Sequence, residues 1–139
     1  MKQPRDYPLM LQRKAADDLI AADAIMQTGK ALDTVGFHAQ QATEKSRKAI
    51  LSFHGVEYPR THDLAQLLTL VLDFMPQMME FSDRILPLTP YAIQVRYADE
   101  DLLLEKGAIR AFEAATKVYG FTVRQLGLGH EQPEDWYID

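Results

Sequence analysis

A polar stretch inside an apolar helical pattern is the most informative part of this sequence. It reads Phe37-His38-Ala39-Gln40-Gln41-Ala42-Thr43-Glu44-Lys45-Ser46-Arg47 and runs through His54-Gly55 to Pro59-Arg60-Thr61-His62-Asp63-Leu64. Apolar residues recur in it at helical spacing, which predicts a helix from about Val35 to His54. Gly55 stands where a left-handed C-terminal cap is expected. Packing alone does not require so many hydrogen-bonding side chains, so function is sought here first.

The rest of the chain predicts further helices. Residues 8–29 carry a stripe with the helical period, made of Leu11, Ala15, Leu19, Ala22 and Met26. Thr61 is the expected N-cap of a helix from Asp63 to Phe74, which Pro76 closes. One short helical piece is expected in residues 77–99, where Pro87 and Pro90 interrupt any longer helix. Its apolar residues are Met78, Met79, Phe81, Ile85 and Leu86.

A last long helix is expected from Asp101 to Leu126, with acids at its start that suit the positive end of the helix dipole. No strand-like alternation longer than a few residues occurs. The sequence therefore predicts an all-α fold, an up-and-down antiparallel bundle of about four to five helices. One domain is expected over residues 1–139, with its core at about 8–126 and an acidic tail at 127–139.

Composition excludes several kinds of site and location. The 139 residues include no cysteine, which rules out disulfides, zinc-thiolate sites and cysteine nucleophiles. No apolar run approaches the roughly 20 residues that span a bilayer, and the first residues lack the apolar stretch of a secretory signal. We therefore expect a soluble, cytoplasmic protein without a membrane partner.

The charge is unevenly distributed along the chain. A net charge of -5 argues against broad, non-specific binding to nucleic acid. Between Phe37 and Arg60, however, four positive residues face two acids, which leaves room for a local phosphate site. The positive residues are Lys45, Arg47, Lys48 and Arg60. The tail holds four acids together with Trp136, Tyr137 and Ile138, a composition that suits a docking strap or a partner contact.

A helical wheel divides the second helix into two faces. At roughly 100° per residue, Gln40, Glu44, Leu51 and His54 fall within about 60° of Arg47. Val35, Ala42, Ala49 and Phe53 cluster on the opposite side. This pattern predicts that the second group packs against the first helix and against Leu68 or Val71 of the third. Arg47 and His54 are predicted to share a face outside the core.

The Arg47 and His54 pair suits phosphate chemistry. The two residues are two helical turns apart, a rise of roughly 10 Å, so both side chains can reach one phosphate group. A guanidinium offers phosphate a fixed fork of donors, and histidine exchanges a proton near neutral pH. The alternative is an ordinary exposed face, with Glu44 and Lys48 as an i,i+4 pair and His54 capping carbonyls.

Two further histidines, His38 and His62, have competing interpretations. His38 lies on the apolar side, where a hydrogen-bonded core role is favoured over a ligand role. His62 could face a phosphate or could tie down the loop from Tyr58 to Thr61. No metal and no cofactor are predicted, because no His-Glu-x-x-His pattern, no i,i+4 histidine pair and no Gly-rich phosphate loop occur.

Three motifs in this order resemble the HEPN domain (higher eukaryotes and prokaryotes nucleotide-binding). They are Phe37-His38-Ala39-Gln40-Gln41-Ala42-x-Glu44-Lys45, Arg60-Thr61-His62-Asp63-Leu64 and Arg96-Tyr97-Ala98-Asp99. The resemblance covers roughly residues 8–126. It implies a helical bundle that commonly forms a homodimer, often with a minimal nucleotidyltransferase as its toxin-antitoxin partner.

The resemblance also implies a possible activity. Active members of the superfamily are metal-independent ribonucleases that use an Arg and a His separated by four to six residues, with two copies meeting across a dimer cleft. Arg47 and His54 fit this spacing at its upper limit. Lys48 departs from the pattern, because a small polar residue often follows the Arg.

Three functions follow as alternatives. In a ribonuclease, Arg47 would hold the scissile phosphate, and His54 would act as general acid or base on the ribose 2′-hydroxyl. In a nucleotide-binding module, Arg47, His62 and Arg96 would grip phosphates while Tyr91 or Tyr97 packs against base or sugar. In a structural dimer, Leu51 on its polar face would meet a partner. The first two rank equally, above the third.

Overall fold

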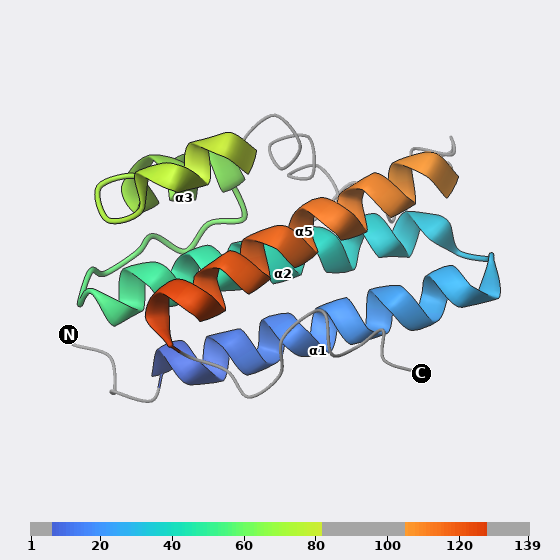
Figure 1. Ribbon diagram of the computed structural model, residues 1–139, viewed down its shortest axis with the longest axis horizontal. Helices are drawn as coiled ribbons and strands as arrows, with labels where there is room; N and C mark the ends of the chain where they lie inside the picture. The colour runs from blue at the N-terminus through green and yellow to red at the C-terminus, as the bar shows by residue number, and fades with distance from the viewer. Residues whose placement is uncertain (1–6, 82–104, 128–139) are drawn as a thin grey trace.

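The protein is an all-α bundle, as predicted. The computed structural model describes residues 7–81 and 105–127. In chain order these residues form α1 (Tyr7–Thr28), α2 (Leu32–Phe53), α3 (Leu64–Val71), the 3₁₀ helix η1 (Pro76–Phe81) and α5 (Glu105–Leu126), with no strand among them (Figure 1). None of the helices in this part of the chain combines the length and the apolar character that crossing a bilayer requires.

The bundle is built around α2. The helices α1, α2 and α5, each of 22 residues, lie along one another and pack in all three pairs. Helix α3 packs against α2 on the side away from α1 (Figure 1). Because α2 touches all three other α-helices, more of its circumference is buried than a surface helix would bury.

Small residues bring the three long helices together. The main core joins Ala15 and Leu19 of α1 to Ala39 and Ala42 of α2, with an alanine-rich stripe of α5. That stripe consists of Ala111, Ala114, Ala115, Val118, Tyr119 and Val123. On the other side, Leu64, Leu67, Leu68 and Val71 of α3 enter the same cluster. Short side chains allow close approach of the helix backbones, which excludes water from the interior.

Helix α2 ends as the sequence predicts. Gly55 has φ 74°, the left-handed conformation that glycine adopts without a steric penalty. The amide of Val56 donates to the carbonyl of Leu51 at 2.9 Å, and the amide of Gly55 donates to that of Ser52 at 3.0 Å. These bonds satisfy two of the last carbonyls of α2 and turn the chain toward α3.

The predicted limits of the third helix are wrong. Its N-cap is Asp63, whose Oδ1 accepts from the amides of Ala65 (2.9 Å) and Gln66 (3.4 Å). Thr61, the predicted N-cap, bonds to the actual cap residue instead: its Oγ1 accepts from the amide of Asp63 at 3.0 Å. The helix ends at Val71, and Pro76 begins η1 instead of closing α3, because proline fits the first position of a helix, where no amide donor is needed.

Two predicted positions on α2 are also wrong. Phe53, expected in the core, is 49% exposed, whereas Leu51, expected on an outer polar face, is fully buried. Leu51 is buried because α3 and the loop before it cover the face that the wheel assigned to the surface. Phe53 is the last residue of α2. Asp101, Ile85, Leu86, Pro87, Pro90 and the tail from residue 128 lie outside the described residues.

We expect the substitution Asp63→Ala to destabilise the protein by about 1 kcal/mol, because two amides at the start of α3 lose their acceptor. Urea unfolding followed by circular dichroism measures the effect. Asp73→Ala is the matched control, since Asp73 is exposed just beyond the end of α3. Equal midpoints for the two variants would contradict the capping role.

Candidate functional site

Three buried polar residues on one side of α2 hold the segment that leads into α3. Gln40 Nε2 donates to the carbonyl of His62 at 3.1 Å, and Arg47 Nη1 donates to that of Leu64 at 2.6 Å. Between them, Glu44 Oε1 lies 2.7 Å from His62 Nδ1. We call Gln40, Glu44 and Arg47 the polar seam. They stand about one turn apart, so each reaches the same short segment, residues 62–64.

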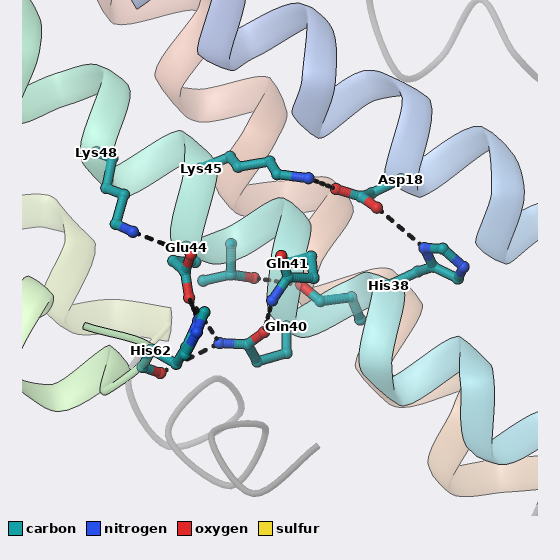
Figure 2. A network of polar contacts seen from close by, with 10 residues as sticks. Asp18, His38, Gln40, Gln41, Glu44, Lys45, Lys48 and His62 are labelled. Carbon is teal, nitrogen blue, oxygen red and sulfur yellow. Dashed lines mark hydrogen bonds and ion pairs between the residues drawn. The ribbon is translucent and has the colours of Figure 1, made fainter. Parts of the chain in front are cut away.

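Glu44 is bonded through both of its carboxylate oxygens. Its side chain is 5% exposed. Oε1 also accepts from Gln40 Nε2 at 3.2 Å, and Oε2 accepts from Lys48 Nζ at 3.1 Å (Figure 2). A buried carboxylate is tolerated when cations and amides satisfy it, and Glu44 has both.

The polar contacts continue from α2 to α1. Asp18 of α1 receives the Nζ of Lys45 and lies 2.9 Å from Nδ1 of His38 (Figure 2). Gln41 Nε2 donates to Gln40 Oε1 at 2.7 Å, which adds a further bond to the polar seam. His38 thus has a hydrogen-bonded structural position. The polar residues of the 37–45 motif therefore tie α2 to α1 on one side and to residues 62–64 on the other.

The prediction that Arg47 and His54 share an outer face is wrong. Arg47 is fully buried, and its Nε and Nη2 have no hydrogen-bond partner among the described residues. Burial lowers the pKa of its guanidinium to about 10, so it still carries a charge at neutral pH. His54 is exposed and stacks on Phe74, with ring centroids 4.3 Å apart. Within one chain, the arginine lies in the interior and the histidine at the surface.

A hollow of about 590 Å³ lies where the start of α1 meets α2 and the loop after it. We call it the basic groove. It is lined by Tyr7, Leu11, Glu44, Lys45, Lys48, Glu57, Tyr58 and Arg60. Three of the four positive residues counted in the sequence therefore meet at one place, and only Arg47 is absent.

The cations of the basic groove differ in how they are held. Lys45 is paired with Asp18 and Lys48 with Glu44. The Nζ of Lys48 also lies 5.5 Å from the ring centroid of Tyr58, a cation–π contact. Tyr58 in turn donates from its hydroxyl to that of Tyr7 at 3.0 Å, which closes one wall. Arg60 is exposed and has no partner among the described residues, so its guanidinium can receive an anion.

Only part of the basic groove and its surroundings was predicted from the sequence. His62 does bind the loop to α2, although 54% of its side chain stays exposed. Arg96, Tyr97 and Tyr91 lie outside the described residues. The two wall tyrosines were missed, because they are 51 residues apart and only the fold brings them together. The signal that did point here was the excess of positive charge between residues 37 and 60.

The fold is an all-α bundle in which polar side chains of α2 connect it to α1 and to residues 62–64. These side chains are histidine, glutamine, glutamate and lysine, and together with the fold they define a class of helical domain. The family model of the HEPN domain matches residues 9–126. The chain belongs to the HEPN family. Comparison with curated proteins and with solved structures finds no match.

We expect Glu44→Ala to lower the free energy of unfolding by about 3 kcal/mol, because His62, Gln40 and Lys48 lose a buried acceptor together. Chemical denaturation measures the loss. Glu113→Ala removes an exposed glutamate of α5 and is expected to stay within about 0.5 kcal/mol of the parent protein. A Glu44 variant as stable as this control would show that the polar seam contributes little.

Proposed function

We propose that this HEPN-family protein binds the phosphate groups of a nucleotide or of RNA in the basic groove. The observation that carries the proposal is the convergence of Lys45, Lys48 and Arg60 around one hollow. Its volume of about 590 Å³ falls within the usual range of ligand pockets.

The groups of the basic groove suit different parts of such a ligand. Arg60 offers an uncommitted fork of donors that matches two oxygens of one phosphate. Lys45 and Lys48 are paired with carboxylates, which offset much of their charge, so Arg60 is the principal phosphate ligand and the two lysines contribute less. The tyrosine wall supplies an aromatic surface for a base or a ribose. Of the predicted set, Arg47 is buried, whereas Arg96 and Tyr97 lie outside the described residues and stay a prediction.

A second candidate function is metal-independent endoribonuclease activity through Arg47 and His54. Two observations favour it. Two nitrogens of the Arg47 guanidinium are uncommitted, and the His54 imidazole is open to solvent. The reaction would require Arg47 to reach the surface when RNA binds. A homodimer, and a minimal nucleotidyltransferase partner in a toxin-antitoxin pair, are proposals that follow from membership of the HEPN family alone.

Arg60→Ala is expected to weaken binding of ATP, or of a single-stranded oligoribonucleotide, at least tenfold, because a bidentate phosphate contact is lost. Isothermal titration calorimetry gives the affinity, and ligand-induced shifts of the melting temperature give an independent measure. Arg124→Ala, which removes an exposed cation at the end of α5, is the control and should bind as the parent protein does. Equal weakening in both variants would indicate diffuse charge attraction instead of a site.

If Arg47 and His54 catalyse cleavage, His54→Ala should slow cleavage of single-stranded RNA in the presence of a chelator by roughly 10²- to 10⁴-fold, the usual contribution of a general acid or base. Since His54 is exposed, the helical circular dichroism signal should not change. Phe53→Ala, one residue earlier and also exposed, controls for the loss of an aromatic ring at this end of α2. Full activity in the His54 variant would remove this candidate.

A further inference from the structure

The acidic tail, residues 127–139, is a feature of the sequence that the proposed function does not use. It holds four acids and neither lysine nor arginine. Trp136, the single tryptophan of the chain, directly follows Glu134 and Asp135. Of this segment the structure describes only Gly127. Carboxylates next to an aromatic ring offer the two kinds of group, anionic and aromatic, that the basic groove is proposed to bind.

The acidic tail begins at the end of the bundle that holds the basic groove. The end of α5 lies at the same end of the long axis as the start of α1 and the end of α2 (Figure 1), and α5 packs against both helices. Gly127 ends α5 in the left-handed conformation, with φ 65°, and its amide donates to the carbonyl of Val123 at 2.8 Å. Trp136 follows Gly127 by nine residues, a reach of up to about 30 Å. Since packed helices lie about 8–10 Å apart, the groove is within this reach.

Arg60 provides the contact for a carboxylate of the acidic tail. Lys45 and Lys48 are paired with carboxylates, whereas the exposed guanidinium of Arg60 has no partner among the described residues. An arginine holds the two oxygens of a carboxylate with the same fork of donors that it offers to a phosphate. Glu44 and Glu57 also line the groove, so the attraction for an acid is local to Arg60.

The tyrosine wall provides the contact for the indole ring. Tyr7 and Tyr58 are joined through their hydroxyls at 3.0 Å, and both line the groove together with Leu11. Both tyrosines are only partly buried, so their rings can receive a further aromatic group. Aromatic side chains pack on one another in offset-stacked or edge-to-face arrangements, and tryptophan offers the largest surface for this.

We propose that the acidic tail binds in the basic groove of its own chain, with Trp136 on the tyrosine wall and Glu134 or Asp135 at Arg60. The inference rests on the proposed function, because the tail then competes with a nucleotide or RNA for the same groups. A ligand tethered by a short linker has an effective concentration on the order of millimolar, so weak contacts suffice to fill the groove. An incoming phosphate ligand must displace the tail, which lowers its apparent affinity by the fraction of molecules whose groove is free.

Trp136 reports its own position, because the chain has no other tryptophan. Its fluorescence emission should move to longer wavelength when ATP displaces the tail into water. Arg60→Ala should give the same shift without ATP. Arg110→Ala removes another exposed cation, on α5, that has no partner among the described residues, and this matched control should keep the emission of the parent protein.

The tail itself is tested in the full chain with a double variant, Glu134→Gln with Asp135→Asn, which we call the tail-neutral variant. It should show the shifted emission without ATP. Isothermal titration calorimetry should show that it binds ATP about three- to tenfold more tightly than the parent, since no tail has to be displaced.

Three results would overturn the proposal. They are unchanged emission in Arg60→Ala, ATP binding by the tail-neutral variant that is no tighter than that of the parent, and an emission of the parent that depends on protein concentration, as exchange of tails between two chains requires. The proposed function has a separate outcome, because Arg60→Ala should weaken ATP binding at least tenfold in the tail-neutral variant too. A shifted emission in Arg60→Ala with no ATP binding by any variant would reject the phosphate site and support the bound tail.

Discussion

The polar seam of α2 is the constraint on which the rest of the structure depends. Its three members, Gln40, Glu44 and Arg47, contact residues 62–64 from inside the protein. A hydrophobic contact tolerates small slips along a helix, but these directional bonds fix the position of the loop against α2. With the loop fixed, Asp63 caps α3 at one place, and the apolar side of α3 closes over the core. The basic groove depends on the same bonds, because Arg60 lies two residues before the anchored segment 62–64.

Burying the polar seam costs desolvation free energy. Hydrogen bonds and ion pairs offset this cost more fully for Glu44 than for Arg47. Glu44 has three donors, two of them on residues that can carry positive charge, so its carboxylate is well satisfied. Arg47 has one acceptor and no described carboxylate, and burial lowers the pKa of its guanidinium to about 10. An apolar residue of similar length would cost less at position 47. The arginine is thus a weak contributor to stability, which directs attention to a role in ligand binding or in fixing the loop.

The helices were predicted well from the sequence, but the packing of other elements around α2 was predicted less well. The limits of α1, the end of α2, the role of Gly55 and the HEPN family could be read from periodicity and motifs, whereas α2 begins at Leu32, three residues before the predicted Val35. The wheel also placed Gln40, Glu44, Arg47 and Leu51 on one stripe correctly. The wheel could not predict that α3 covers this stripe, because the angular position of a residue on one helix carries no information about which other elements pack against it. For the same reason Arg47 was expected in the phosphate site, whereas Lys45 and Lys48, on its two sides, line the basic groove.

Glu44 links the stability of the fold to the charge of the basic groove. Glu44 holds the loop, pairs with Lys48 on the groove side and sets the tautomer of His62. Its removal therefore changes fold and local charge at once, and ligand binding lost in Glu44→Ala would not identify the cause. The conservative change to glutamine keeps the shape and an acceptor oxygen while it removes the charge. A difference between the two variants separates the effect of losing the buried side chain from the effect of losing its charge.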